Sequence, residues 1–401
     1  MRQDIGFINE TPTMTQLRIP AVYMRGGTSK GVFFLAGDLP ADPVARDRLL
    51  LRVIGSPDPY GKHIDGMGGA TSSTSKVVLI SKSGRADCDV DYLYGGLAVD
   101  KPSIDWSGNC GNLTAAVGPF AISSGLVAAP VEGWASVRIW QANIGKKIVA
   151  HVPMHQGEVQ EDGDFELDGV ALPSAEIKLE FIDPGADEGE GEGGAMFPTG
   201  RVTDWLEVPG VGRIEATLIN AGLPTIFVAA ESLGFKGTEL QPDINPFPEV
   251  LARIEKIRLH GATAMGLAAT PDEAAKRAHT PKLSFVASSA EYTTSDGRVV
   301  KAADVDLLAR VFSMGPLHHA MTGTGAVAIA SAVAVPGTIP HRLARKRSDG
   351  WVRFGHPSGT LNVGAEAREE GGQWIVSKVM MSRSARRLMQ GWVFVPGALG
   401  D

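Results

Sequence analysis

The sequence predicts an α+β fold made of two domains of similar build. Three observations predict it. Segments with strand-like alternation outnumber helical segments in both halves of the chain, an acidic and glycine-rich run separates the halves, and a short motif occurs once in each. The length of 401 residues fits two to three domains at about 150 residues each.

Alternating polarity and β-branched side chains indicate the strands. In the second half, Gly222-Leu223-Pro224 is expected to interrupt a hairpin. We expect single strands at 18–24, 76–81 and, more weakly, 90–99, and hairpins formed by 135–141 with 147–153 and by 213–220 with 225–229.

Helices are fewer. Small residues predict one helix that begins at Asn112 or Thr114 and ends at about 123. Apolar side chains at helical spacing predict a second helix over 248–265. A third is expected over 303–312, because Asp304 and a second aspartate lie near its start.

The run ADEGEGEGG at 186–194 carries acidic residues and glycines and no large apolar side chain. Such a composition is typical of a solvated loop or linker. We therefore expect the two domains to meet close to residue 185.

A short motif suggests that the two domains are related. CGNLTAAV at 110–117 resembles TGTGAVAI at 322–329, since each has glycine in second place and continues as a small-residue helix. The first position is Cys110 in one copy and Thr322 in the other. A duplicated domain would bring two helix N-termini to one cleft, where free N–H groups and the positive helix ends favour carboxylates.

Composition excludes several classes of function. A net charge of −7 and an aromatic content of 6% disfavour a nucleic-acid partner. The longest apolar stretch, 326–335, is too short to span a bilayer, and the first 17 residues show no apolar core of a signal peptide. We expect a cytoplasmic protein with no membrane or nucleic-acid partner.

Cys110 is the strongest candidate for chemistry. A helix N-terminus favours the thiolate, so we expect a partly exposed base or nucleophile there, between Asn109 and Asn112. The other cysteine, Cys88, is interpreted as buried and structural. Two cysteines without a CxxC pair indicate neither a disulfide framework nor a zinc site.

Other polar segments leave two interpretations open. The loop RGGTSKG at 25–31 and the run DGMGGATSSTSK at 65–76 could bind an anion or could simply be turns. The arginines of 383–387 could form a solvated face or an anion site. Adjacent histidines at 318 and 319 would not face each other on a helix, so no metal is expected there. A GxSxG motif is absent, which leaves serine hydrolysis unsupported.

Five longer motifs resemble the PrpF family of methylaconitate isomerases, over roughly residues 18 to 396. They are MRGGTSKGVFF (24–34), IGSPDPYGKHIDGMGGATSSTSK (54–76), DWSGNCGN (105–112), FGHPSGTLNVGAEA (354–367) and SRSARRLMQGW (382–392). The resemblance implies a diaminopimelate-epimerase-like fold, in which two pseudo-symmetric domains each curl a small sheet around a central helix and the active site lies in the cleft between them. It also implies that the C-terminal segment returns to the first domain, which gives domains of 1–185 plus about 383–401 and of 186–382.

Amino-acid epimerases of that fold use two cysteines, one in each domain. Here Thr322 replaces the second, and a hydroxyl cannot remove a proton from carbon at neutral pH. The resemblance implies Lys76 as the catalytic partner of Cys110, in either order of base and acid. The residues expected to bind a tricarboxylate substrate are Arg25, Gly26, Thr28, Ser29, Ser75, Asn109, Gly111, Asn112, Met321, Thr322, Gly323, Thr324 and Gly325.

The function implied by the resemblance is an allylic proton transfer on 2-methylaconitate or 4-methylaconitate, in propionate catabolism through the 2-methylcitrate cycle. It needs no cofactor and no metal, and it implies functional pairing with an aconitase-like 2-methylcitrate dehydratase. A homodimer is compatible with it. Two alternatives stay open: 4-oxalomesaconate tautomerase or a related Δ-isomerase of aromatic-acid breakdown, and a non-catalytic accessory protein of the iron–sulfur dehydratase. Retention of both Lys76 and Cys110 argues against the accessory role.

Overall fold

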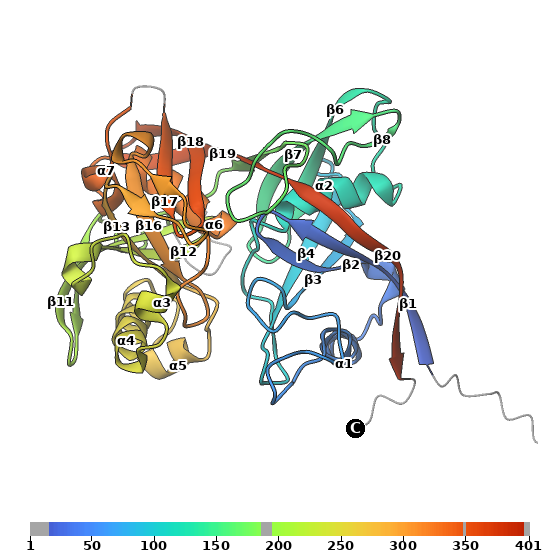
Figure 1. Cartoon of the computed structure of the whole chain (residues 1–401), viewed down its shortest axis with the longest axis horizontal. Coiled ribbons are helices and arrows are strands. Elements are labelled where there is room, and N and C mark those ends of the chain that lie inside the picture. The colour runs from blue at the N-terminus through green and yellow to red at the C-terminus, as the bar shows by residue number, and fades with distance from the viewer. Residues whose placement is uncertain (1–15, 186–194, 348–349, 397–401) are drawn as a thin grey trace, which may run out of the picture.

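The computed structural model describes residues 16–185, 195–347 and 350–396, so the predicted linker at 186–194 lies outside the described residues. Two lobes of similar size lie side by side (Figure 1), each with a sheet curled around one central helix. Within the described residues the strands of both lobes belong to a single 18-stranded sheet. No described helix is long and apolar enough to cross a membrane.

The strands of the first lobe form one line in which each strand is hydrogen-bonded to the next. The line runs β20 (Ala385–Pro396), β1 (Gln16–Gly26), β2 (Ser29–Leu35), β3 (Lys76–Lys82), β4 (Val90–Leu97), β6 (Gly133–Gln141), β7 (Lys146–His155) and β9 (Ile177–Ile182). Two short strands pair with members of this line: β5 (Ile104–Asp105) with β4 and β8 (Glu158–Val159) with β7.

The second lobe repeats this arrangement. β14 (Tyr292–Thr293) and β15 (Val299–Val300) form a separate two-stranded sheet. The line runs β10 (Asp204–Val208), β11 (Gly212–Ala221), β12 (Leu223–Ala229), β13 (Lys282–Ser288), β16 (Leu307–Phe312), β17 (Trp351–His356), β18 (Gly359–Glu370) and β19 (Gln373–Arg383).

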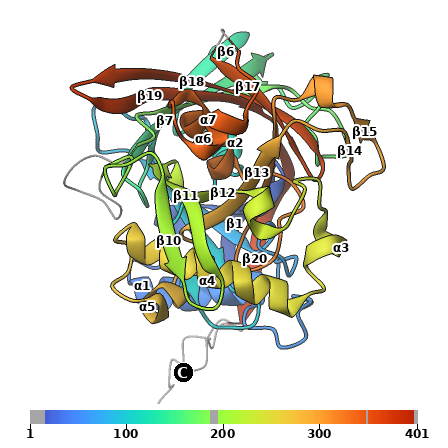
Figure 2. The ribbon, with the colours of Figure 1, turned by 90° about the vertical axis from the view of Figure 1, so that its left-hand side faces the viewer.

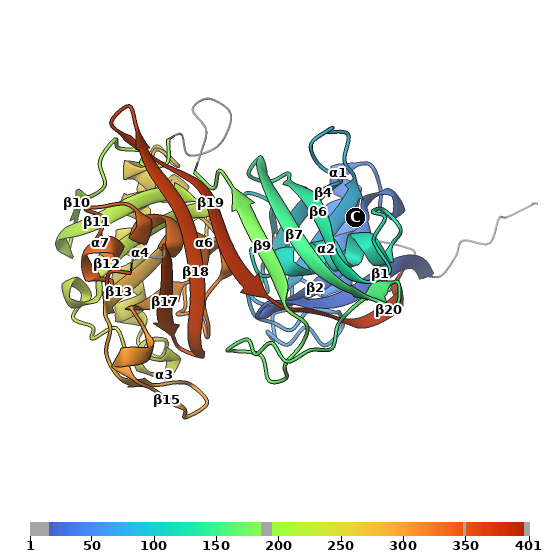
Figure 3. The same cartoon turned by 90° about the horizontal axis from the view of Figure 1, so that it is seen from above.

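Strand directions match between the two lines. The parallel pairs are β2–β3 and β4–β6 in the first lobe and β12–β13 and β16–β17 in the second, at the same places in each line. The lobes join where β9 pairs with β19 (Figure 3), and β20 then enters the first lobe to pair with β1. The predicted division of the chain at residue 185 stays a prediction.

The central helices are α2 (Thr114–Ser123) and α6 (Gly323–Ala334), and both are apolar on nearly every side. Small side chains allow each sheet to close tightly around its helix: a Cβ atom at Gly118 would lie only 2.8 Å from a methyl group of Val152. One apolar core includes both helices and the inner faces of both lobes. Burial on all sides therefore fixes the position of each helix inside its lobe.

The remaining helices lie outside the curled sheets. α1 (Pro43–Ile54) packs its apolar face beside β20, and α4 (Pro248–Ala264) covers part of the second lobe beneath β10 and β13 (Figure 2). The short elements are α3 (Gln241–Ile244), α5 (Pro271–Ala275), α7 (Ile339–Leu343) and the 3₁₀ turns η1 (Ala36–Asp38), η2 (Ala230–Leu233) and η3 (Ala302–Asp304).

The α+β class, the repeated architecture and most of the predicted elements are confirmed. Most of the predicted elements begin and end within two residues of their expected bounds. They are the strands at 18–24, 76–81 and 90–99, both hairpins, and the helices at 114–123 and 248–265. In the second hairpin, Gly222 alone separates the strands, with a φ of +70°.

The helix expected over 303–312 is wrong. Residues 302–304 form η3, and Leu307–Phe312 is the central strand β16, buried along its whole length between β13 and β17. Leucine, alanine and arginine favour a helix in isolation, but a strand buried on both faces has no polar alternation to reveal it. The buried guanidinium of Arg310 on this strand donates to the carbonyl groups of Glu239 and Gly355.

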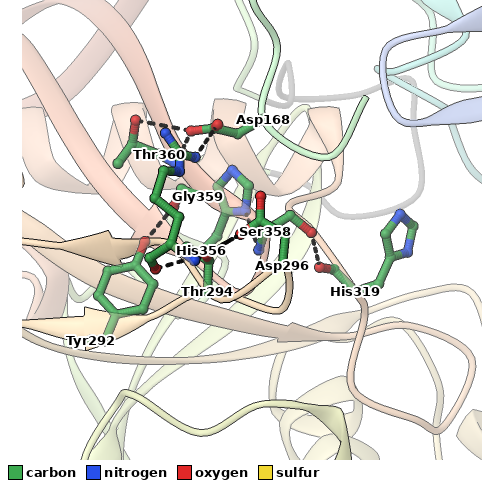
Figure 4. A network of polar contacts seen from close by, with 10 residues as sticks. Asp168, Tyr292, Thr294, Asp296, His319, His356, Ser358, Gly359 and Thr360 are labelled. Atoms are coloured by element: carbon green, nitrogen blue, oxygen red, sulfur yellow. Dashed lines mark hydrogen bonds and ion pairs between the residues drawn. The ribbon is translucent and has the colours of Figure 1, made fainter. Parts of the chain in front are cut away.

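A polar network fastens the two lobes together (Figure 4). Asp168, from the first lobe, accepts hydrogen bonds from the backbone N–H of Thr360 at 2.5 Å and from its hydroxyl at 3.3 Å, and it pairs with Arg298. Nearby, the Nδ1 atom of His356 accepts from the backbone N–H of Ser358 at 3.3 Å. Burial lowers the pKa of His356 to about 3, with the charges of two neighbouring arginines adding to the effect.

We predict that His356 makes the fold sensitive to acid. Its pKa is lower in the folded state than its usual 6.5, so the unfolded state binds the extra proton and stability falls as the pH drops below 6.5. The expected loss from this histidine is about 2 kcal/mol between pH 7 and pH 5. Urea unfolding at both pH values should therefore show a smaller difference for His356→Asn than for the wild type.

The exposed His155 supplies the matched control, and His155→Gln should keep the wild-type pH dependence. An equal pH dependence in His356→Asn and the wild type would contradict the prediction.

Candidate active site

The N-termini of the two central helices touch where the lobes meet. A Cβ atom at Gly111 would lie 2.7 Å from the carbonyl carbon of Gly323, and a Cβ atom at Gly323 would lie 2.4 Å from that of Gly111. Cβ atoms do not approach backbone this closely, so both positions require glycine. The close contact brings both sets of helix-end amides to one place.

Cys110 lies directly before the first turn of α2. Its carbonyl accepts hydrogen bonds from the backbone N–H and the hydroxyl of Thr114, both at 3.0 Å, and from the hydroxyl of Tyr92 at 3.2 Å. Three donors on one carbonyl fix the main chain at Cys110.

Thr322 caps α6 in the corresponding place. Its side-chain oxygen accepts a hydrogen bond from the backbone N–H of Gly325 at 3.1 Å. The hydroxyl therefore serves as an N-cap. The two related side chains make different contacts: the Cys110 thiol accepts a hydrogen bond from Lys76 of its own lobe, and the Thr322 hydroxyl caps its own helix.

Lys76 reaches the thiol from the first residue of β3. Its Nζ atom donates to Sγ of Cys110 and to Oγ of Ser29, each at 3.1 Å, and lies 5.7 Å from the ring centre of Tyr94. Lys76 is 7% exposed and Cys110 is 5% exposed. The expectation of a partly exposed thiol is wrong, because α6 and the lysine side chain close over the first turn of α2. The amine and the thiol are within reach for direct proton transfer.

A second lysine occupies the other lobe. Lys282, the first residue of β13, donates to Oγ of Ser313 at 3.1 Å and to the carbonyl of His279 at 3.5 Å. It is buried, and burial lowers its pKa to about 7, with the Lys76 ammonium as the next largest cause. Two buried lysines, one from each lobe, therefore lie at one site.

A small cavity of about 20 Å³ lies between these groups. Its lining residues are Ser29, Ser72, Lys76, Asn109, Cys110, Gly111, Asn112, His279, Lys282, Ser313, Met314, His318, Thr322, Gly323 and Thr324. Ser72, Ser313, Met314 and His318 also line a larger cleft between the lobes, of about 1140 Å³. The cleft provides a path to the cavity, and the cavity must enlarge to admit a ligand of several carboxylates.

Two buried polar side chains at the cavity have atoms without a hydrogen-bond partner in the described structure. They are Nδ2 and Oδ1 of Asn109 and Nε2 of His279. Burial lowers the pKa of His279 to about 3, followed by the charge of Lys282, so its ring is neutral. Unmatched buried polar atoms are costly, and a polar ligand would satisfy them.

The structure brings together most of the predicted site residues. The cavity is lined by Ser29, Lys76, Asn109, Cys110, Gly111, Asn112, Thr322, Gly323 and Thr324. It does not include Arg25, Gly26, Thr28, Ser75, Met321 or Gly325.

The residues outside the cavity have structural contacts. Arg25 donates to the carbonyl of Ser384 at 3.0 Å, and Ser75 contacts the ring of His63 at 3.3 Å. Thr28 accepts a hydrogen bond from Asn112, and Arg383 donates to the same asparagine, at 2.9 and 3.2 Å. These contacts support the loops around the cavity. The buried Arg383 thus differs from the exposed arginines at 386 and 387.

The sequence did not assign a binding role to Ser72, His279, Lys282, Ser313, Met314 or His318, although Ser72 lies in the run at 65–76 that could bind an anion. One signal could have revealed Lys282. Both KVVLISK (76–82) and KLSFVAS (282–288) open a strand with lysine, and the two strands share one burial pattern. The other five residues lie on loops without a repeated pattern.

The histidines at 318 and 319 lie in a loop, where their rings stack at 4.5 Å between centroids. The helical spacing assumed for them is therefore wrong. In the part of the chain that the structure describes, no group of three or more His, Cys, Asp or Glu side chains could hold a metal ion. Cys88 is buried, as expected for a structural cysteine.

Comparisons with known proteins identify the family to which the chain is similar. A sequence profile described as "PrpF protein" matches residues 16–396. The chain is 64% identical to a protein from Cupriavidus necator named 2-methyl-aconitate isomerase, over 95% of this chain and 98% of that relative. It is 62% identical, with the same coverage, to a protein of the same name from Shewanella oneidensis.

Solved structures support the fold. A crystal structure named methylitaconate-delta-isomerase matches with a TM-score of 0.77 and 37% identity, over 96% of this chain and 98% of the other. A hydroxyproline epimerase from Agrobacterium vitis matches with a TM-score of 0.54 and 13% identity, over 96% and 93% of the two chains. The second match confirms the predicted epimerase-like fold.

We predict that Gly323→Ala destabilises the protein by about 1–3 kcal/mol, because backbone of the other lobe would have to move away from the new methyl group. The loss is expected although alanine is the better helix former. Urea unfolding measures it.

The matched control is Gly391→Ala, since a Cβ atom at Gly391 would meet nothing within 4 Å. This control should stay within about 0.5 kcal/mol of the wild type. Equal midpoints for the two variants would contradict close contact between the helix ends.

Proposed function

The chain belongs to the PrpF family, and on that premise we propose that it is an isomerase of 2-methylaconitate, an unsaturated tricarboxylate. The observation that carries the proposal is the 3.1 Å contact between Lys76 Nζ and Cys110 Sγ beside the joined helix N-termini. It supplies two groups that can exchange protons with carbon next to a site that favours carboxylates.

The proposed reaction is an allylic proton transfer. One of Lys76 and Cys110 removes a proton from an allylic carbon, and the electron pair of that C–H bond enters the conjugated system to give a dienolate. The other group returns a proton at the far allylic carbon, so that the double bond moves and no atom is gained or lost. Helix-end amides and the nearby lysines stabilise the additional negative charge.

One line of support favours this substrate over 4-oxalomesaconate. The relatives at 64% and 62% identity both carry the name 2-methyl-aconitate isomerase, whereas the relative named 4-oxalomesaconate tautomerase is 37% identical. Proton transfer between carbon atoms requires neither a redox step nor a Lewis acid, so we propose that the enzyme needs no cofactor.

The same proposal includes the biological setting. The enzyme would act in the cytoplasm, in propionate catabolism through the 2-methylcitrate cycle, and would be functionally paired with an aconitase-like 2-methylcitrate dehydratase. We also propose a homodimer and domains of 1–185 plus about 383–401 and of 186–382.

We predict that purified wild-type protein converts synthetic methylaconitate isomers in D₂O without added metal. Lys76→Ala and Cys110→Ser should each lower kcat/KM by at least about 100-fold, because a general acid or base usually contributes at least that much to the rate. Proton NMR measures conversion and the entry of solvent deuterium into the carbon skeleton. Treatment with a chelator should leave the wild-type rate unchanged.

Matched controls come from the same lobe. Lys82→Ala changes an exposed lysine at the other end of β3, and Cys88→Ala changes the other cysteine, so both should keep the wild-type rate. Folded wild type that leaves methylaconitate unchanged would overturn the assignment, and 4-oxalomesaconate is the substrate to test next. Full activity of Cys110→Ser would remove the thiol from the mechanism.

A further inference from the structure

We propose that His63 is a positioning residue, which holds the chain directly before Lys76 and so sets where the Lys76 ammonium lies against the Cys110 thiol. The inference rests on the proposed function, because it concerns the two groups that would carry out the proton transfer. His63 is not among the residues that line the cavity, so the proposal gives it no contact with the substrate.

The segment between α1 and β3 has no regular structure of its own, so other contacts must order it. Neither helix nor strand occurs over residues 55–75. The backbone N–H of Gly68, in the middle of the segment, donates to the carbonyl of Ile54 at the end of α1, at 3.0 Å. His63 lies inside this segment and is only 2% exposed. A buried polar ring in such a place needs hydrogen-bond partners among its neighbours.

The partners of the His63 ring assign its tautomer. Nδ1 accepts a hydrogen bond from the backbone N–H of Ala70 at 3.1 Å, so this atom carries no proton and the ring proton lies on Nε2. Nε2 lies 3.2 Å from Oγ of Ser56, whose hydroxyl donates to the carbonyl of Ala98 at 2.8 Å. The Ser56 oxygen therefore accepts from Nε2. Oγ of Ser75 lies 3.3 Å from Nδ1 and is a second donor to it.

The ring is also closely enclosed. A Cβ atom at Gly68 would lie 2.1 Å from Nδ1, so only glycine allows the chain to pass this near to the ring. The backbone N–H of His63 donates to the carboxylate of Asp58 at 2.6 Å, which holds the main chain beneath the ring. The two ring nitrogens therefore connect the beginning of the segment with its end.

These contacts reach the Lys76 ammonium through Ser75. Ser75 directly precedes Lys76, and its carbonyl accepts from the backbone N–H of Leu97 at 3.0 Å. The Lys76 side chain then extends to Cys110 and Ser29, and Nζ lies 3.1 Å from the thiol and from the hydroxyl. Without the ring, the Ser75 hydroxyl would lose its acceptor, and fewer contacts would hold the chain that carries the ammonium.

In the second lobe, a different residue precedes the corresponding lysine. Lys282 opens β13 as Lys76 opens β3, and the two strands share one burial pattern. The residue before Lys282 is Pro281, which has neither a hydroxyl nor a backbone N–H to donate to a histidine. Lys282 donates to Ser313 and to a backbone carbonyl and not to a thiol. The histidine contact thus accompanies the lysine that can exchange a proton with its neighbour.

The test separates positioning from substrate binding by kinetics. A reacting group that shifts by about 1 Å can cost roughly 100-fold in rate. His63→Leu removes both ring nitrogens, and it should lower kcat roughly 10- to 100-fold while KM stays within about threefold of the wild type. His63→Asn keeps an acceptor, Oδ1, in the place of Nδ1, and should recover most of the lost kcat.

Ser75→Ala removes only the hydroxyl that the ring accepts, and it replaces His63→Leu in both assays if that variant does not fold. It should lower kcat and leave KM near the wild-type value, whereas loss of a serine that binds substrate would raise KM. The control for stability is Leu206→Ala, at a buried position of β10 in the other lobe. This control should lower the urea midpoint and keep the wild-type kcat.

A second assay needs no substrate. In a Cys88→Ala background, Cys110 is the remaining cysteine, and mass spectrometry follows its alkylation by iodoacetamide. A nearby ammonium makes a thiol more reactive, because the thiolate is the nucleophile. Displacement of Lys76 therefore slows alkylation, whereas wider opening of the segment speeds it with or without Lys76. The rate of His63→Leu relative to its parent should be at least about threefold lower with Lys76 present than in Lys76→Ala.

Equal relative rates in the two backgrounds, or a raised KM with unchanged kcat in His63→Leu and Ser75→Ala, would overturn the inference. The alkylation and isomerase assays can fail separately. A lower relative rate with Lys76 present, in a protein that leaves methylaconitate unchanged, would support the role of His63 and reject the proposed substrate. Wild-type isomerisation together with equal relative rates would do the reverse.

Discussion

The contact between Gly111 and Gly323 is the constraint on which the site depends. Neither helix end could approach the other with a side chain in place, since the missing Cβ atoms would lie 2.7 and 2.4 Å from opposing backbone. Because α2 and α6 are each enclosed by a curled sheet and share one apolar core, this contact sets how closely the two lobes approach at the site. Lys76 and Lys282, at the first residues of β3 and β13, are brought to one cavity as a consequence.

A duplicated fold supplies two copies of each position, and the chemistry depends on where the copies differ. Cys110 and Thr322 precede related helices, but only the thiol is free of helix capping. The lysines differ through these neighbours: one contacts a group that can exchange a proton, and the other contacts a serine and a carbonyl. The two copies of the motif therefore place different polar neighbours around two equivalent lysines.

The sequence was sufficient for the parts of the fold and site that local patterns encode. Alternation and β-branched side chains revealed the strands, including the buried β3, and the repeat around Cys110 and Thr322 revealed the two helix ends. They could not reveal β16, because Leu307–Phe312 is buried throughout, has no alternation, and carries only one β-branched residue, Val311, among residues that favour a helix. His279, Ser313 and Met314 reach the cavity only because the lobes meet there, and no spacing along the chain encodes that approach. Burial of Cys110 escaped prediction for the same reason.

The cavity also shows why such a site would bind its ligand by rearrangement. Its volume of about 20 Å³ cannot hold a tricarboxylate, whereas the adjoining cleft of about 1140 Å³ can. Burial and the nearby Lys76 lower the pKa of Lys282 to about 7, and Asn109 and His279 have buried polar atoms without a protein partner among the described residues. A polycarboxylate bound at the cavity would place negative charge beside Lys76 and Lys282 and oxygen atoms beside Asn109 and His279.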